Sequence, residues 1–152
     1  MGYKVTLLGR ARLERRLNAI PKATKDLVKK DMEKIAQEIV DKMKAIVPVD
    51  TGALRDSIGW TWGRPPKGST AFAVAKNTLG SEMTLTIYAG NEATLVKSAN
   101  GRRPYLQKAW IVEFGTSRTP AQPYFRPVWK TERKRVKSKV RSAVRKAVKA
   151  TQ

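Results

Sequence analysis

The sequence contains no cysteine and no histidine among its 152 residues. Without cysteine the chain cannot form disulfides, a thiolate nucleophile or a zinc site built on sulfur. Without histidine it lacks the commonest metal ligand and the commonest general base near neutral pH. Because these absences remove most of the usual catalytic chemistries, we expect a protein that is not an enzyme.

Acidic residues are also scarce: 12 Asp and Glu stand against 32 Lys and Arg, which gives a formal net charge of +20. Such a charge attracts polyanions, so DNA, RNA, an anionic membrane and an acidic protein surface are all candidate partners. The chain has no run of eighteen or more apolar residues, and residues 1–16 lack the apolar block of a secretory signal. We therefore expect a soluble protein made in a cytoplasm, with no membrane partner.

Two stretches have the periodicity of helices. Residues 21–47 carry apolar side chains at steps of three and four, which predicts a long amphipathic helix. A narrower stripe with Val136, Val140 and Val144 predicts a second helix over about 128–150. Residues 129–152 hold ten Lys or Arg and one acid, Glu132, so this second helix is strongly basic.

The region between the helices, about 57–115, has the pattern of a small sheet. Apolar and polar residues alternate over 58–62 and 83–89, and residues 72–75 suggest a further strand start. Residues 91–104 are expected to form a mobile basic loop, after which residues 109–114 return to the core as a largely apolar run. Residues 115–127 contain three prolines, which predicts an extended arm.

These elements together predict an α+β fold. The long N-terminal helix and the basic C-terminal helix would pack on a small antiparallel sheet. Residues 3–8 could add a first strand, and residues 10–18 have helical spacing. A length of 152 residues suits one modest core, so we expect residues 1–152 to form a single domain.

The segment Asp50-Thr51-Gly52 is the one motif that invites a catalytic interpretation, because aspartic proteases use Asp-Thr-Gly to place a carboxylate that shares a proton with a second one. That site ends an apolar strand, whereas here Pro48 and a long helix come directly before the motif. We interpret the segment as a turn in which Asp50 or Thr51 caps exposed amides and Gly52 permits unusual dihedral angles. A Mg²⁺ site built from the scattered carboxylates alone stays open as an alternative.

Basic residues in the second helix and in one loop are candidate contacts to a partner or to nucleic acid, since a cation that neutralises a phosphate releases a counterion. An acidic protein surface or a solvated face would explain the same charges. Of the tryptophans, Trp60, Trp62 and Trp110 are predicted to be buried, while Trp129 is a candidate interface residue. The candidate contacts are Arg102, Arg103, Arg133, Lys134, Arg135, Lys137, Arg141 and Arg145.

Two sequence blocks carry a family resemblance. Residues 47–58 read VPVDTGALRDSI after the long helix, and residues 112–127 read VEFGTSRTPAQPYFRP before the last helix. In order, separation and flanking helices, over about residues 10–150, they resemble the phage tail-component family of tail-completion, neck or head-tail joining proteins. The matching positions are Asp50, Thr51, Gly52, Leu54, Arg55 and Ser57 in the first block, and Glu113, Gly115, Thr116, Pro120, Ala121, Pro123, Phe125, Arg126 and Pro127 in the second.

The resemblance implies a structural virion protein with no cofactor. It implies a ring, expected to be hexameric, between the head connector and the tail tube, with the genome passing through its centre. The implied neighbours are connector or stopper proteins and tail-terminator or tail-tube proteins, and assembly would take place in the host bacterial cytoplasm. The alternative function is that of a sequence-independent nucleic-acid-binding protein that uses the basic C-terminal helix.

The residue types in the two blocks suggest structural tasks. The prolines would stiffen the arm, and a stiff arm loses less entropy when it docks on a neighbouring subunit. Tyr124 and Phe125 would dock the arm. Glu113 and Arg126 have opposite charge and are expected to pair within or between subunits, in a contact of little energy if it is exposed.

Overall fold

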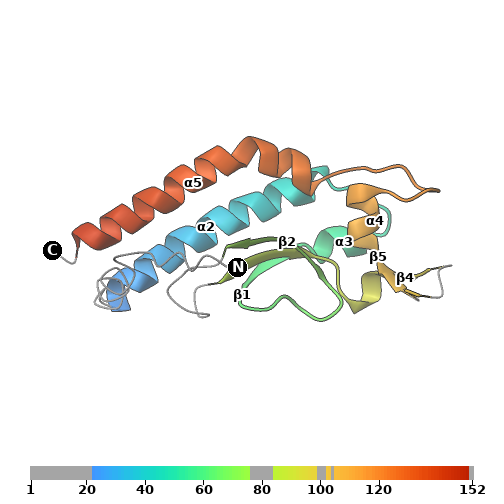
Figure 1. The fold of residues 1–152 in the computed structure, drawn as a ribbon, viewed down its shortest axis with the longest axis horizontal. Helices are drawn as coiled ribbons and strands as arrows, with labels where there is room; N and C mark the ends of the chain where they lie inside the picture. Colours follow the sequence, from blue (N-terminus) through green and yellow to red (C-terminus); the bar gives the residue numbers. More distant parts are fainter. Residues whose placement is uncertain (1–21, 76–83, 99–101, 104, 151–152) are drawn as a thin grey trace, which may run out of the picture.

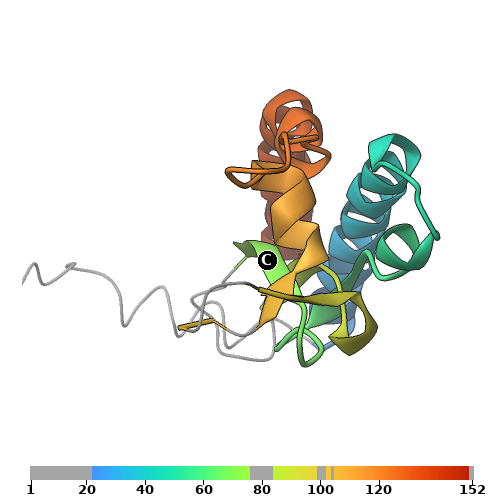
Figure 2. The same cartoon turned by 90° about the vertical axis from the view of Figure 1, so that its right-hand side faces the viewer.

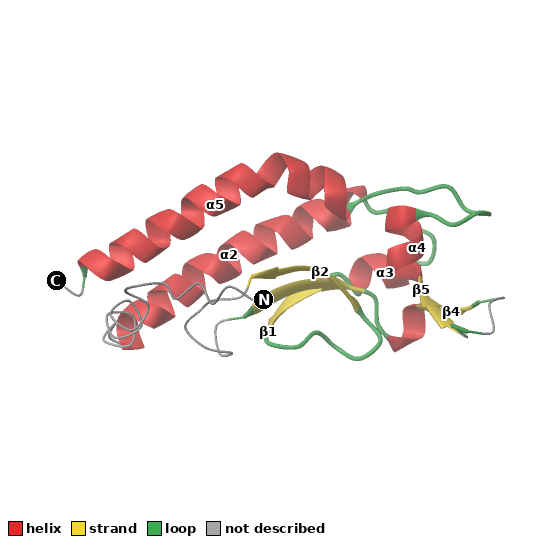
Figure 3. Cartoon of the chain, in the orientation of Figure 1, coloured by secondary structure: helices red, strands yellow, loops and turns green. Residues whose placement is uncertain are grey.

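The computed structural model describes residues 22–75, 84–98, 102–103 and 105–150. Its two long helices, α2 (Lys22–Ile46) and α5 (Phe125–Lys149), run alongside each other above a small sheet (Figure 1). The two long helices form a layer separate from the strands, whereas α3 and α4 lie beside the strands at one end (Figure 3). The predicted α+β class, with two long helices packed on a small antiparallel sheet, is confirmed.

Helix α2 forms because its apolar residues repeat with the helical period. Ile35, Ile39, Val40 and Met43 lie on one face and are buried in the core. The helical hydrogen bonding ends after Val47, whose amide donates to the carbonyl of Met43, since the following proline disfavours helical geometry. The helix predicted over 21–47 is therefore confirmed to within a residue at each end.

The main sheet has three antiparallel strands in the order β1-β3-β2. They are β1 (Gly59–Trp62), β2 (Thr70–Ala75) and β3 (Leu85–Ala89). Trp60 pairs with Ile87 on the central strand, and both tryptophans of β1 reach α2. The Trp60 indole N–H donates to Gln37 at 2.9 Å and that of Trp62 donates to Glu33 at 2.8 Å. These bonds fix the sheet under α2, as the alternating pattern predicted.

A second, two-stranded sheet pairs β4 (Leu95–Lys97) with β5 (Tyr105–Gln107). It follows a short 3₁₀ turn, η2 (Glu92–Thr94), in which the Asn91 side chain accepts the amide of Thr94. The expectation of a mobile loop over 91–104 is therefore wrong for residues 92–97. The buried Gln107 side chain supplies the physical reason, because its amide group donates to the carbonyls of Gly68 and Asn91 and its oxygen accepts from Thr94.

Two short helices, α3 (Ala53–Asp56) and α4 (Lys108–Phe114), lie at the end of the molecule where α2 ends and α5 begins (Figure 1). Viewed from this end, α4 stands in front of α5 (Figure 2). The apolar run 109–114 is thus a helix, and Trp110 is 45% exposed, so its predicted burial is wrong. The strand predicted at 3–8 and the helix at 10–18 lie outside the described residues.

Helix α5 begins at Phe125, about three residues earlier than the sequence predicted. Phe125 and Val128 are buried, and Phe125 stacks on Phe72 of β2 at 5.1 Å between ring centroids. Within the described part of the chain, no helix is both long enough and apolar enough to cross a membrane.

Candidate assembly interface

The Pro-rich segment after α4 folds back on that helix. Gly115 ends α4 with φ of 74° and donates its amide to Ile111. Farther along, Gln122 donates to the carbonyl of Val112 at 2.7 Å, so the segment runs back beside the helix. A Cβ on Gly115 would lie 2.8 Å from the amide nitrogen of Ala121, which explains why this position needs glycine. The predicted arm is therefore residues 115–124, and residues 125–127 belong to α5.

Glu113 lies at the centre of this end and its side chain is fully buried. One carboxylate oxygen accepts the amides of Tyr124 and Phe125, each at 2.8 Å, and the other accepts the amide of Arg126 at 2.9 Å. These are unpaired amides at the start of α5, where a negative charge also interacts favourably with the helix dipole. Glu113 thus caps α5 from another helix.

The expected pair of Glu113 and Arg126 forms within the chain, with 3.7 Å between the Arg126 Nε and a carboxylate oxygen. The pair is only partly exposed, because the carboxylate has 0% exposure while the arginine side chain stays 61% exposed. Buried charge is stable only when it is paired and hydrogen-bonded, and the three amides and the guanidinium meet that condition.

Tyr124 completes the joint between α4 and α5. It is fully buried, and its hydroxyl donates to the carbonyl of Ala109 at 3.0 Å. Burial, and then the charge of the neighbouring Glu113, raises the pKa of the Tyr124 hydroxyl well above its ordinary value. Tyr124 and Phe125 therefore fix the end of the arm in the core of the same chain.

The first block reaches the same end of the molecule. Gly52 has φ of 86° and precedes α3, whose Leu54 is buried. Asp50 does not cap this helix; its carboxylate instead pairs with the Lys108 ammonium group of α4 at 3.1 Å. The Thr51 hydroxyl accepts the Ala53 amide in a long bond of 3.4 Å.

Ser57 closes the first block. Its hydroxyl donates to the carbonyl of Leu54 at 2.6 Å and accepts the amide of Gly90 at 2.9 Å, so α3 is tied to the end of β3. Arg55 is exposed and pairs with Asp56 at 3.4 Å. The ion pair of Asp50 with Lys108 therefore connects the first block to the start of α4, the helix in which the second block begins.

Sequence reasoning missed the exposed aromatic pair formed by Trp110 and Phe114. The two rings lie 5.0 Å apart on adjacent turns of α4 and are 45% and 42% exposed. The Arg126 guanidinium lies 5.2 Å from the centre of the Phe114 ring. The four-residue spacing of Trp110 and Phe114 was the available signal, because it places both rings on one face of α4. Ala109 and Glu113 have the same spacing and face α5, so the neighbouring aromatic pair faces outward.

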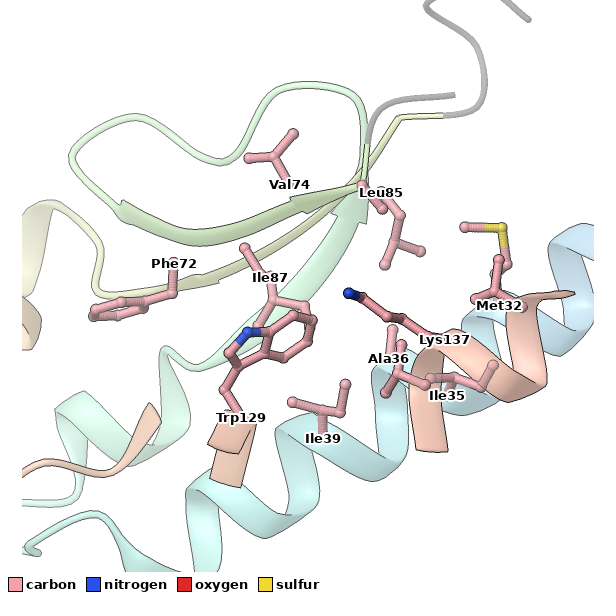
Figure 4. Close-up of a pocket in the computed structure, with 14 residues that line it drawn as sticks. Met32, Ile35, Ala36, Ile39, Phe72, Val74, Leu85, Ile87, Trp129 and Lys137 are labelled. Atoms are coloured by element: carbon pink, nitrogen blue, oxygen red, sulfur yellow. The ribbon is translucent and has the colours of Figure 1, made fainter. Parts of the chain in front are cut away.

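Trp129 lines an apolar groove between the long helices and the sheet, with a volume of about 370 Å³ (Figure 4). It stacks on Phe125 at 5.8 Å and is only partly exposed. The Lys137 side chain extends across the same groove (Figure 4). Phe72 and Val74 of β2 form the opposite wall.

The structure divides the candidate basic contacts. Arg102 and Arg103 are exposed beside the β4–β5 sheet, far from α5 in the sequence. Arg135 pairs with Glu38 and with Glu132, each at 3.1 Å, so its charge is balanced within the chain. The other candidates on α5 are exposed, namely Arg133, Lys134, Lys137, Arg141 and Arg145.

Carboxylates do not gather into a reactive group in the part of the chain that the structure describes. No three acidic side chains there lie close enough to hold a metal ion. Asp50 is 78% exposed at the surface, in an ion pair, and does not end a buried strand as the protease motif does. In the described site the motif residues hold α3, α4 and the arm in place.

The described residues form a small α+β chain in which residues of both sequence blocks hold α3, α4 and the arm together. A sequence model of the family described as "Bacteriophage HK97-gp10, putative tail-component" matches residues 11–115, which is more than half of the chain. The chain therefore belongs to this family of phage tail components. No curated protein and no solved structure matches it.

Proposed function

We propose that this tail component acts at the phage neck, in tail completion or head-tail joining. Its copies assemble into a ring, proposed to be hexameric, between the connector or stopper and the tail-terminator or tail-tube proteins. The genome passes through the centre of the ring. Residues 1–152 act as one domain, assembly takes place in the host cytoplasm, and the mechanism is docking and not catalysis.

The observation that carries this proposal is the exposed aromatic pair of Trp110 and Phe114 on a rigidly held helix. Aromatic residues and arginine are the commonest energetic anchors of protein interfaces, and here Arg126 lies against the pair. Helix α4 is held by Glu113 from one side and by the Asp50–Lys108 ion pair from the other. Because the surface is already ordered, little conformational entropy is lost on docking.

A closed ring needs two different surfaces on each subunit that fit each other in a head-to-tail manner. We propose that α4 and the arm provide one of them. Residues 116–123 of the arm are exposed throughout, so they are accessible to a neighbouring subunit beside the aromatic pair.

The test replaces both aromatics in the double variant Trp110→Ala/Phe114→Ala. The matched control is Val144→Ala/Val148→Ala on α5, where the side chains are 40% and 39% exposed, much as the aromatics are. Each variant would supply the protein to a phage that lacks it, and electron microscopy would count heads joined to tails. We expect few joined particles with the aromatic variant and normal numbers with the control.

The size of the expected effect follows from interface energetics. Truncating one anchor residue costs about 2 kcal/mol or more, which weakens docking by about 30-fold. Equal numbers of joined particles for the aromatic variant and the control would contradict the proposed role of α4.

A further inference from the structure

Two sets of cations on α5 lie on different faces of the helix. On the face toward α2, Arg135 and Lys139 pair with Glu38 at 3.1 and 3.2 Å. On the same side Lys42 of α2 pairs with Glu132 of α5 at 2.5 Å. These cations join the two long helices, so their charge is balanced inside the molecule.

The second group is the cationic stripe, defined as Lys134, Arg141 and Arg145 with Ser138 between them and Lys137 at its edge. These five residues line one shallow polar pocket of about 330 Å³. Their spacing of three and four residues places them on one face of the helix. Among the described residues, no ion pair is recorded for any cation of the stripe.

The stripe has a length and an environment that suit a polyanion. Lys134 and Arg145 are eleven residues apart, which spans about 16 Å along a helix. That length corresponds to about five base pairs at about 3.4 Å each. No described element lies over the side of α5 that is turned away from α2 and the sheet (Figure 1).

We propose that the cationic stripe of α5 binds the phosphate backbone of duplex DNA without reading its sequence. Phosphates on one strand recur at intervals that a straight row of exposed cations can follow, and each neutralised phosphate releases a counterion.

An acidic protein would need an apolar anchor, since interface cores are rich in aromatic residues and poor in lysine. The stripe itself contains no apolar side chain, and the exposed apolar residues beside it on α5, Val144 and Val148, are not aromatic. Interfaces with DNA, in contrast, are polar and strongly positive.

This inference is independent of the proposed docking role of α4. The stripe lies in the middle and C-terminal part of α5, whereas the aromatic pair lies on α4 at the opposite end of the long axis (Figure 1). A variant that loses DNA binding should still join heads to tails through α4. A variant that loses head-tail joining through α4 should still bind DNA.

The experiment measures the binding of the full chain to a fluorescent duplex of about 24 base pairs, five times the length of the stripe, by anisotropy. The stripe variant is Lys134→Gln/Arg141→Gln/Arg145→Gln. The matched control, Lys30→Gln/Arg64→Gln/Lys97→Gln, changes three exposed cations on other parts of the chain. Both variants lower the formal charge from +20 to +17, since three charges are removed in each.

The expected difference lies in the dependence of affinity on salt. Three phosphate contacts contribute about −2.7 to the slope of log K against log salt, at about −0.9 for each contact. Between 50 and 200 mM salt we expect the control to lose about 40-fold more affinity than the stripe variant. Glutamine has a helix propensity close to that of lysine and arginine, and circular dichroism would check that α5 remains folded.

Two results would overturn the proposal. One is the same salt slope for the stripe variant and the control. The other is displacement of the duplex by poly-glutamate at an equal concentration of charge, because it would show that the stripe prefers an acidic protein to DNA.

Discussion

At the scale of single residues, Glu113 of α4 holds the end of the arm and the start of α5 through one buried carboxylate. Its oxygens accept the amides of Tyr124, Phe125 and Arg126. In Glu113→Gln the charge is lost and one oxygen is replaced by an NH₂ group, which cannot accept these amides. We expect a loss of about 3 kcal/mol in the free energy of unfolding, measured by urea denaturation.

The control for this change is Glu92→Gln, which makes the same substitution in a side chain that is 64% exposed and pairs with Lys67 only at 3.7 Å. Exposed pairs of this kind contribute little, so the free energy of unfolding of Glu92→Gln should stay within about 0.5 kcal/mol of that of the wild type. Similar midpoints for the two variants would show that the cap on α5 is not a major source of stability.

The hydroxyl of Tyr124 predicts a response to alkaline pH. Its pKa is raised in the folded protein, first by burial and then by Glu113, so the folded state keeps the proton that the unfolded state releases above about pH 10. The stability that this proton provides is present below pH 10 and decreases as pH rises further, by at most about 1.4 kcal/mol per pH unit.

Replacement by phenylalanine separates this effect from general alkaline unfolding. Tyr124→Phe should be less stable than the wild type near pH 8, because the bond to the Ala109 carbonyl is lost, yet its stability should fall less steeply above pH 10. Tyr105→Phe, at a tyrosine that is 55% exposed, is the matched control. Parallel pH curves for wild type and Tyr124→Phe would refute this explanation.

At the scale of elements, the sequence predicted the helices and strands whose periodic pattern continues over several residues. It missed those whose conformation depends on contacts with residues distant in the sequence. Helix α2 and strands β1 and β3 follow patterns of period 3.6 and 2. The run 109–114 is almost wholly apolar, so neither period stands out and a short core segment was the reasonable prediction. Its helical form depends on Glu113 and Tyr124, whose partners are distant in the sequence.

The candidate site shows the same division. The sequence blocks located the residues that hold the docking surface, and Gly52 and Gly115 take the positive φ angles that their type suggests. The exposed aromatic pair was missed because the four-residue spacing of Trp110 and Phe114 shows that they share a face of the helix but not which face is exposed. Only the inward direction of Glu113 decides it.

The arm depends on Gly115, which predicts a clear contrast between two glycine substitutions. Gly115 and Gly63 both have positive φ, of 74° and 83°. A Cβ at Gly115 would meet the backbone of Ala121 at 2.8 Å, whereas nothing lies within 4 Å of a Cβ at Gly63. We expect Gly115→Ala to lower the free energy of unfolding by about 2 kcal/mol more than Gly63→Ala.

Thermal denaturation would measure both variants, and Gly63→Ala serves as the control for backbone strain alone. If the two alanines cost the same, the arm is not held against α4 as the structure indicates, and the proposed docking surface would lose its rigid support.

At the scale of the whole molecule, the charge of +20 must act on the proposed ring and on DNA binding in opposite directions. Copies of the chain repel one another, and salt screens that repulsion, since the screening length falls from about 10 Å at 0.1 M to about 3 Å at 1 M. The aromatic pair on α4 contributes apolar contact that salt does not weaken. We therefore expect self-association, followed by sedimentation velocity in the absence of DNA, to strengthen from 0.1 to 1 M NaCl.

DNA binding by the stripe should weaken over the same range, because released counterions must return to a more concentrated solution. The two salt responses thus have opposite signs for one chain. Self-association that weakens as salt rises would mean that ion pairs between subunits hold the ring, and not the apolar surface of α4. The Trp110→Ala/Phe114→Ala variant distinguishes these cases directly, since it should abolish the salt-strengthened association and leave the salt slope for DNA as it is in the wild type.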